Sequence, residues 1–377
     1  MAAVAGLGLA LLGGPLGAGA GAQPTSNPQS KGFTLTILDR LGSGAGPSDT
    51  SVGIGADGLG LISYYDRENG DLKVAHCRNF ICRAATMAVL DDEGDVGRWS
   101  SVAIGADGLG LVSYYDATNG DLKVAHCQNA ACSAATTATI DTDGGPSSIA
   151  VGADGLGLIG FEAGGARKVA HCSDLVCSTA TAATIDAVQG EPHPSITIGA
   201  DGLGLISYAD RTEDEGFGLN VAHCTDASCS TATTATPLPF FLERVTSITV
   251  GTDGLGLISF ADIDSNLAVA HCSNLACSAA TSAYLGVYFV RATSIAVGAD
   301  GLGLVTSVRG DALGLDVARC QDVACTSGTH TSVDPSIFAE GYTSITIGAD
   351  GSPLISYYDD SDLKVAHCSD PSCVPRR

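Results

Sequence analysis

Short runs of apolar and β-branched residues, separated by polar turns, recur along most of the chain. Within residues 101–141, four such runs follow one another at 101–105, 109–116, 121–127 and 134–140. They are rich in Val, Ile, Thr and Tyr, which is typical of β-strands. No stretch shows the 3.6-residue period of an amphipathic helix. The pattern therefore predicts an all-β fold built from four-stranded units.

Asp-Gly and Asn-Gly dipeptides mark the turns inside the units. Asp-Gly follows the first run of every unit, and Asn119-Gly120 follows the second run of the unit just described. These dipeptides favour two-residue hairpins, because both central positions of such turns take positive φ values. We therefore expect antiparallel hairpins, with a two-residue turn between the first and second strands.

The unit occurs seven times, and its Gly-(Ala/Thr)-Asp-Gly signature recurs every 47 to 52 residues. Repeated four-stranded units of this length are typical of β-propeller blades. The last unit ends without its fourth run, whereas residues 34–39, ahead of the first unit, match residues 86–91. An N-terminal strand that completes the C-terminal blade closes the ring. Over residues 32–374 the sequence thus resembles the seven-bladed β-propeller superfamily.

The predicted organisation is a signal peptide, a linker and one propeller domain. Residues 1–22 combine an apolar stretch with small residues near a cleavage site, although the basic start of a signal peptide is missing. Residues 23–31 form a polar linker, and residues 32–374 form the propeller. The blades are expected at 51–91, 101–141, 147–186, 195–236, 247–285, 294–333, and 344–374 together with 32–39.

Charge and hydropathy narrow the range of partners. The chain of 377 residues has 41 acidic and 18 basic side chains, giving a net charge of −23. This balance argues against binding to nucleic acid or to anionic membranes. No segment after the N-terminal stretch has 18 consecutive apolar residues, so no membrane span is expected. Much of the negative charge falls in the turns after the second and fourth strands, which share one face and could attract cationic partners.

The 14 cysteines form seven Cys-x4-Cys pairs, one in each unit, where the third strand should turn into the fourth. Residues that flank a short hairpin loop face each other within disulfide range. The predicted disulfides are Cys77–Cys82, Cys127–Cys132, Cys172–Cys177, Cys224–Cys229, Cys272–Cys277, Cys320–Cys325 and Cys368–Cys373. Seven disulfides and a signal peptide predict a secreted, periplasmic or cell-surface protein.

Zinc is the competing interpretation of the cysteines. A histidine precedes the first cysteine in six units, and Arg319 takes its place in the other. Structural zinc sites favour closer cysteine spacing, and adjacent residues of a strand point to opposite faces. We therefore expect the histidines to pack between blades.

The aspartates of the Asp-Gly turns form the first candidate site. The topology of a propeller places them near the channel on one face, where carboxylates could bind calcium. The alternative is that Asp-Gly simply suits a tight hairpin. The candidate calcium ligands are Asp57, Asp107, Asp154, Asp201, Asp253, Asp300 and Asp350. No cofactor is required by any motif, and calcium is the one considered.

The loops between units, where the repeat is broken, form the second candidate site. Three arginines stand three residues before the serine that opens an inner strand, and aromatic residues lie in the same loops. Such a group could stack on a sugar or bind an anionic group. Alternatively, the arginines pair with nearby acids and the aromatics close the top of the core. The candidate ligand-binding residues are Arg98, Trp99, Glu191, His193, Phe241, Arg244, Arg291 and Tyr342.

The preferred function is a secreted or cell-surface binding propeller, lectin-like or adhesive and calcium-assisted, with a glycan or protein ligand. Seven similar blades suit multivalent binding, whereas catalysis needs an asymmetric group of residues. A structural surface component is one alternative. A glycoside hydrolase or lyase, with a carboxylate pair such as Glu191 and Glu243, is another. The sequence contains no Gly-x-Ser-x-Gly or His-Glu-x-x-His motif, so no catalytic residue is assigned.

Overall fold

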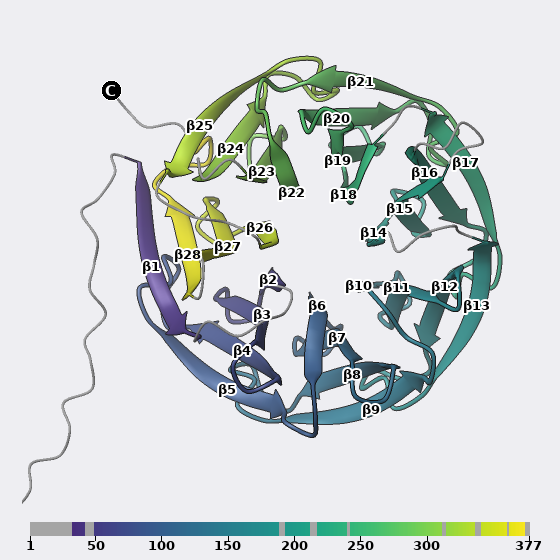
Figure 1. Cartoon of the computed structure of the whole chain (residues 1–377), viewed down its shortest axis with the longest axis vertical. Coiled ribbons are helices and arrows are strands. Elements are labelled where there is room, and N and C mark those ends of the chain that lie inside the picture. The colour runs from purple at the N-terminus through teal and green to yellow at the C-terminus, as the bar shows by residue number, and fades with distance from the viewer. Residues whose placement is uncertain are drawn as a thin grey trace, which may run out of the picture.

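The chain folds as a ring of seven blades around a central axis (Figure 1), and we call the region around this axis the channel. The computed structural model describes residues 32–41, 49–187, 193–211, 217–239, 242–310, 314–335, 341–359 and 362–373. These residues form 28 strands in seven sheets, each with four antiparallel strands. The predicted seven-bladed propeller is therefore confirmed. The predicted signal peptide at 1–22 and linker at 23–31 lie outside the described residues.

The first strand of each blade lies next to the channel, and the second strand follows it outward (Figure 1). The inner strands are β2 (Thr50–Ile54), β6 (Val96–Ile104), β10 (Ser147–Val151), β14 (Ser195–Ile198), β18 (Leu242–Val250), β22 (Val290–Val297) and β26 (Thr343–Ile347). The second strands are β3 (Gly60–Asp66), β7 (Gly110–Asp116), β11 (Gly157–Ala163), β15 (Gly204–Arg211), β19 (Gly256–Asp262), β23 (Gly303–Arg309) and β27 (Pro353–Asp359).

The third and outer strands complete each blade. The third strands are β4 (Asp71–Cys77), β8 (Asp121–Cys127), β12 (Ala166–Cys172), β16 (Phe217–Cys224), β20 (Leu267–Cys272), β24 (Gly314–Cys320) and β28 (Asp362–Cys368). The outer strands are β5 (Ala85–Asp91), β9 (Ala135–Asp141), β13 (Ala180–Ala187), β17 (Ala232–Leu238), β21 (Ala280–Tyr284), β25 (Gly328–Asp334) and β1 (Phe33–Arg40). Within the described part of the chain, no helix is long and apolar enough to cross a membrane.

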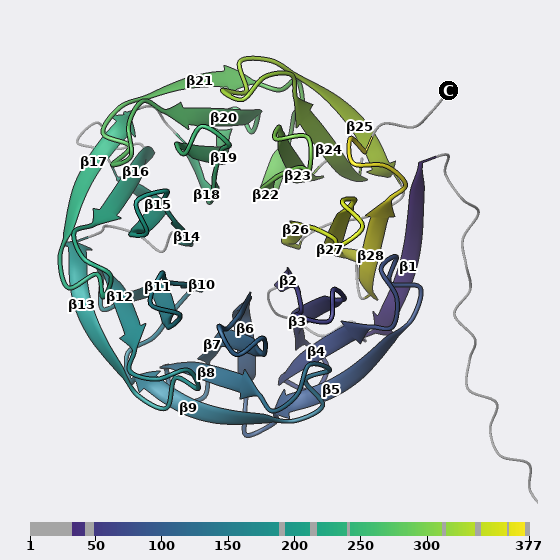
Figure 2. The same ribbon diagram turned by 180° about the vertical axis from the view of Figure 1, so that it is seen from behind.

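The N-terminal strand β1 closes the ring, as predicted. It pairs antiparallel with β28, from Phe33 opposite Cys368 to Arg40 opposite Asp362. Both views show β1, in purple, along the outside of the yellow last blade (Figures 1 and 2). The sheet order β1-β28-β27-β26 therefore joins the two ends of the domain in one blade.

The turn between the first and second strands has three residues, so the predicted two-residue turn is wrong. The Gly55 N–H donates to the carbonyl of Leu59 at 2.8 Å, and the Gly58 N–H donates to the carbonyl of Gly55 at 2.9 Å. Only Gly58 has a positive φ, of 78°. Asp57 keeps a negative φ, and its side-chain Oδ1 accepts the Leu59 N–H at 3.0 Å. The loop is a type I turn followed by a left-handed glycine, which also favours Asp-Gly.

All seven predicted disulfides are present, with Cα–Cα distances of 4.7 to 5.1 Å. The two cysteines do not face each other across the strands, however. Cys77 pairs with Ala85 in the ladder, and Cys82 lies three residues earlier in the loop. Its φ of 50° is left-handed, and its N–H donates to the Asn79 carbonyl at 3.0 Å. This turn, rather than strand pairing, brings the second sulfur back to the first.

The core between blades is built from small and aliphatic residues that fit closely. The second strands of several blades are buried along their whole length, as in β3 and β11. A Cβ at Gly110 would lie 2.5 Å from Leu61 Cδ2 of the preceding blade and 2.8 Å from Cys127 Sγ. The glycine that opens the second strand therefore makes room for both the neighbouring leucine and the disulfide.

At five of the seven interfaces, a carboxylate near the end of an outer strand bonds to a tyrosine or a lysine of the next blade. Asp91 of the first blade accepts hydrogen bonds from the Tyr114 hydroxyl and from Lys123 Nζ of the second blade, both at 2.6 Å. We call this set of Asp, Tyr and Lys the carboxylate latch. The same latch joins β1 to the first blade through Asp39, Tyr64 and Lys73. The strand that closes the ring is thus fixed by side chains as well as by its ladder.

One interface replaces the whole latch with apolar residues. Leu238, Phe260 and Ala268 occupy the positions of Asp91, Tyr114 and Lys123 in the strand registers. All three are buried in a single apolar cluster. Because the three residues change together, no hydroxyl or charge of the set is left buried alone.

Candidate functional site

Seven serines of the inner strands join the blades around one end of the channel. Each serine Oγ accepts a hydrogen bond from a backbone N–H of the next blade, at 3.1 to 3.3 Å. The ring serines are Ser51, Ser101, Ser148, Ser195, Ser247, Ser294 and Ser344. Ser344 accepts from the first blade, so the seven bonds form a closed circuit. A serine that accepts through its oxygen still has its own proton to donate.

A second set of hydroxyls pairs across the blade interfaces. Ser100, for example, donates to Ser63 of the preceding blade at 3.0 Å. Six of the seven interfaces have such a pair. In the remaining interface Gly160 and Pro194 take the two positions, and a Cβ at the glycine would lie 3.8 Å from the proline Cβ. This end of the channel is therefore lined mainly by hydroxyl groups.

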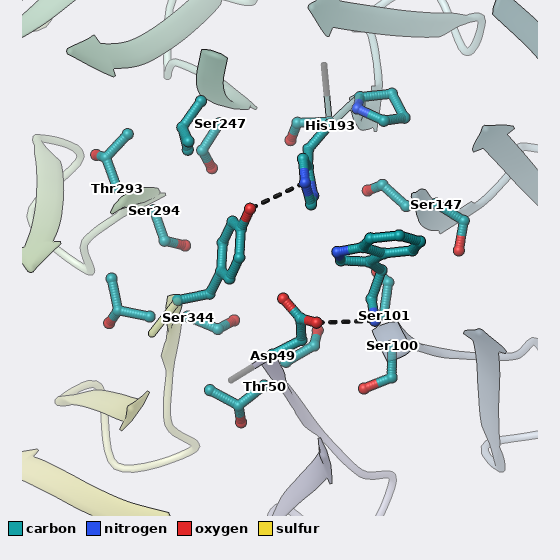
Figure 3. Close-up of a pocket in the computed structure, with 18 of the residues that line it drawn as sticks. Asp49, Thr50, Ser100, Ser101, Ser147, His193, Ser247, Thr293, Ser294 and Ser344 are labelled. Carbon is teal, nitrogen blue, oxygen red and sulfur yellow. Dashed lines mark hydrogen bonds between the residues drawn. The ribbon is translucent and has the colours of Figure 1, made fainter. Parts of the chain in front are cut away.

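The residue two positions before each ring serine differs in every blade. These residues are Asp49, Trp99, Pro146, His193, Val245, Ala292 and Tyr342. A cavity of about 140 Å³ opens at this end of the channel, which we call the mouth. Its lining contains five of these seven residues, together with serines and threonines of the inner strands (Figure 3). The near-sevenfold repeat is broken in the loops that precede the inner strands, and the residue two before each ring serine is where this variation reaches the cavity.

Three rings from three different blades meet at the mouth. The Tyr342 hydroxyl lies 2.9 Å from His193 Nε2, and their ring centroids are 5.0 Å apart. The Trp99 ring meets the His193 ring edge-on, with centroids 5.6 Å apart and an 84° angle between planes. Burial, aided by the nearby charge of Arg167, lowers the pKa of His193 to about 4. The imidazole is therefore neutral at neutral pH, and its Nε2 can accept a hydrogen bond from the tyrosine hydroxyl.

Trp99 is held in an unfavourable backbone conformation. Its φ is 53°, in the left-handed region, which costs a bulky L-residue about 1–2 kcal/mol. The backbone N–H of Trp99 donates to Asp49 Oδ2 at 3.0 Å, which stabilises this conformation. Strained residues of this kind cluster at functional sites. The bond also couples the carboxylate of Asp49 to the position of the indole.

Asp49 is a buried acid at the mouth, with only 4% of its surface exposed. Burial raises its pKa to about 7, although the Trp99 N–H and the charge of Arg98 act in the opposite direction. Burial, followed by the charge of Asp49, in turn raises the pKa of the Tyr342 hydroxyl. Figure 3 shows the carboxylate directed toward the space that His193 approaches from the other side.

The predicted ligand-binding residues are only partly brought together. Trp99, His193 and Tyr342 line the mouth, as expected for a site in these loops. Arg98 instead pairs with Asp95, with Nε 3.1 Å from Oδ1, and lies over the Tyr65 ring. The structure thus supports the alternative interpretation for this arginine, an ion pair with a neighbouring acid.

Arg291 is exposed and also lies away from the lining, beside Gly310. Glu191, Phe241 and the side chain of Arg244 lie outside the described residues. The arginines stand one residue further from the ring serine than the lining residues do, and neighbours along a strand point to opposite sides. The sequence did not predict Asp49 or the ring serines as site residues. Aligning the seven units at the residue two before each serine would have singled out Asp49.

The turn aspartates lie at the other face, and each bonds to a side chain of its own blade. Asp107 Oδ2 lies 2.8 Å from His126 Nε2, and the same contact is present in six of the seven blades. Where Arg319 replaces the histidine, it donates to Asp300 at 2.6 Å. The histidines, expected to pack between blades, thus anchor the turns. Among the described residues, no three His, Cys, Asp or Glu side chains form a group that could hold a metal ion. The calcium ring stays a prediction.

No protein-family model matches the sequence, and no curated protein matches it. Solved structures do match. A protein of unknown function from Dyadobacter fermentans has a TM-score of 0.55 at 11% identity, covering 89% of this chain and 96% of its own. The α-L-arabinofuranosidase Arb93A from Fusarium graminearum has a TM-score of 0.52 at 10% identity, covering 90% and 98%. An ulvan lyase of polysaccharide lyase family PL25 has a TM-score of 0.55 at 10% identity, covering 87% and 94%. At these identities the likeness shows the fold alone.

Proposed function

We propose that this protein is a secreted or cell-surface binding propeller that takes a small hydroxylated ligand, such as a monosaccharide, at the mouth. The observation that carries the proposal is the break in the repeat. The scaffold around the mouth is copied seven times, yet the residue two before each ring serine is different in each blade. The loops between blades vary along their length, and five of these seven varied residues converge on a single cavity, which supports a ligand-binding role.

The size and chemistry of the cavity support a ligand with one ring. Its volume of about 140 Å³ is close to that of the ~150 Å³ cavities that bind benzene. The hydroxyls of the inner strands can donate to and accept from the hydroxyls of a sugar. The ring of Trp99 adds an apolar surface, as pockets for small molecules usually do. A lectin-like role thus has both polar and apolar contacts available.

The seven disulfides support the proposed location, because such bonds form and persist in oxidising compartments. Under this proposal the glycoside hydrolases and polysaccharide lyases among the similar structures share the fold, and their reactions belong to those proteins. A structural component without a specific site is the remaining alternative, and the experiment below separates it from a binding protein.

Trp99 provides the assay, because it is the only tryptophan of the chain. Intrinsic fluorescence is titrated with a panel of monosaccharides up to about 10 mM, where a Kd of ~1 mM or tighter approaches saturation. We expect a saturable change with at least one sugar, and its loss in His193→Ala. Arg291→Ala, outside the lining, serves as the matched control and should bind normally. A panel that leaves both the fluorescence and the Tm unchanged contradicts the proposal and favours a structural role.

A further inference from the structure

The described lining of the mouth contains a single acidic side chain. Among the described residues that line the cavity, Asp49 is the only Asp or Glu, and none is Lys or Arg. His193 adds no charge at neutral pH, because burial lowers its pKa to about 4. The nearest arginine in sequence, Arg98, hydrogen-bonds to Asp95. Asp49 is therefore the charged side chain of the described lining, while the charges of Arg98 and Arg167 act on the mouth from outside it.

This carboxylate has unused bonding capacity. Asp49 is 4% exposed and accepts the Trp99 N–H through Oδ2, at 3.0 Å. No ion pair to Asp49 is present among the described residues, and a carboxylate has about four acceptor positions. A buried carboxylate without a paired cation is costly, and its raised pKa, of about 7, reflects that cost. A cationic group in the cavity would remove the cost by pairing with the acid.

The rings around the carboxylate favour the same kind of group. The rings of Trp99 and Tyr342 line the same cavity as Asp49. Aromatic faces attract ammonium groups through their quadrupole, and tryptophan does so most strongly. An anionic ligand, by contrast, would meet the Asp49 carboxylate and no Lys or Arg of the described lining. These contacts therefore favour a cationic ligand over an anionic one.

We infer that the ligand carries a positively charged amino group that pairs with Asp49, so that the mouth takes a small hydroxylated amine of the amino-sugar class. This inference rests on the proposed function of the mouth. The ammonium donates to the open side of the carboxylate, while the hydroxyls of the ring bond to the serines and threonines of the inner strands. Trp99 responds to the ligand through its N–H bond to the same carboxylate.

The binding of an amine at Asp49 should depend on pH in one direction. The groups that face Asp49 are Trp99 through its N–H, Arg98 and Tyr342, with Tyr358 and the neutral His193 nearby. Both tyrosine hydroxyls have pKa values raised by burial, so they stay neutral. Between pH 5 and pH 8 the carboxylate is therefore the group at the mouth that changes charge. Lowering the pH protonates Asp49 and should weaken the binding of an amine.

Glucosamine, glucose, N-acetylglucosamine and glucuronic acid test the inference, because they share one ring and differ in charge. Their Kd values are measured at pH 7 by Trp99 fluorescence and calorimetry. We expect glucosamine to bind at least about tenfold more tightly than the three others. Asp49→Asn should abolish this preference, measured as the ratio of the glucosamine Kd to the glucose Kd. Asp107→Asn, at the opposite face, is the matched control and should keep the preference.

A second measurement on the wild-type protein keeps the test decisive if Asp49→Asn does not fold. At pH 5 glucosamine is fully charged, whereas Asp49 is protonated, so the preference for glucosamine over N-acetylglucosamine should shrink at least about tenfold. A preference that is absent at pH 7, or unchanged at pH 5, overturns the inference while sugar binding itself stands. If none of the four sugars binds while another monosaccharide of the panel does, the inference fails alone; if no monosaccharide binds, the proposed function fails with it.

Discussion

The carboxylate latch between the first two blades offers a quantitative test of how the ring is held together. Asp91→Asn keeps the size of the side chain and removes its charge. Lys123, whose side chain is 12% exposed, then loses its partner at 2.6 Å and keeps only Asp116 at 3.9 Å. Tyr114 still has an oxygen to donate to. The substitution therefore isolates the cost of an ammonium group left half-paired in the interface.

The expected cost is about 3 kcal/mol. Breaking a buried ion pair by removing one partner typically costs ~3–5 kcal/mol, and the partial exposure of Lys123 favours the lower end. With an unfolding entropy of ~2.1 cal/mol/K per residue, this cost lowers the Tm by about 4 °C for a domain of this size. Burial alone would raise the pKa of Asp91, but the bonds from Lys123 and Tyr114 leave it below its ordinary value. The contribution is thus present above pH ~4 and is lost as the pH falls.

The interface that has apolar residues in place of the latch suggests a variant that should restore the lost stability. The triple variant Asp91→Leu, Tyr114→Phe, Lys123→Ala installs the set found at Leu238, Phe260 and Ala268. Replacing a buried ion pair by well-packed apolar residues is often neutral or stabilising. We expect the free energy of unfolding of the triple variant to lie within about 1 kcal/mol of the wild-type value. The triple variant should therefore be more stable than Asp91→Asn.

Urea unfolding followed by circular dichroism, together with thermal unfolding at pH 7 and pH 3, measures these differences. Each of the three single substitutions is made as well, so that their sum can be compared with the triple variant. The reasoning is refuted if Asp91→Asn costs under 1 kcal/mol at pH 7. It is also refuted if the triple variant is as unstable as the sum of its parts, since the three residues would then not act as a set.

Three further predictions concern the closing strand, the disulfides and the turns. Deleting residues 33–40 should expose the β28 edge and cause aggregation, which size-exclusion chromatography detects. Deleting residues 2–31 is the control and should leave a monomer of normal Tm. If both deletions give equally stable monomers, the prediction is contradicted. Replacing Cys127 and Cys132 by serine should cost about 2 kcal/mol in urea unfolding, as expected for a short loop, and no change would mean that the bond is not formed in solution. Burial alone would raise the pKa of Asp300, but the hydrogen bonds from Arg319 and from a backbone N–H lower it overall. Arg319→Gln should therefore lower the free energy of unfolding by about 0.5 kcal/mol above pH ~4 and leave it unchanged below that pH. A decrease in Tm that is as large at pH 3 as at pH 7 would count against the ion pair.

The fold could be predicted in detail because the same information is repeated seven times. Ring closure depended on a single comparison, between residues 34–39 and 86–91, and the register of β1 on β28 confirms it. The errors concerned local backbone geometry. Both the three-residue turn at Gly58 and the left-handed Cys82 depend on bonds within the loop, and residue spacing alone does not reveal them.

The site could be predicted only in part, because it is made of the residues that escape the repeat. Trp99, His193 and Tyr342 stand out as aromatic residues in a chain that has few of them. Arg98 stands out as well, but a bond to Asp95 turns it away from the channel. Asp49 looks like any other acid in a chain of net charge −23. It becomes a candidate only through its burial and through a described lining that has no Lys or Arg, and both arise from the three-dimensional structure.

The closed circuit of ring serines has a mechanical consequence. In an open stack of sheets, the terminal sheet can peel away by breaking one interface. In this ring every blade is tied on both sides, so opening one serine bond, such as that from Val102 to Ser51, frees no blade. A blade can separate from the ring only when a second interface also opens. The amide protons that bridge the blades should therefore exchange with solvent together and slowly, as one cooperative unit, while the loops above them exchange fast.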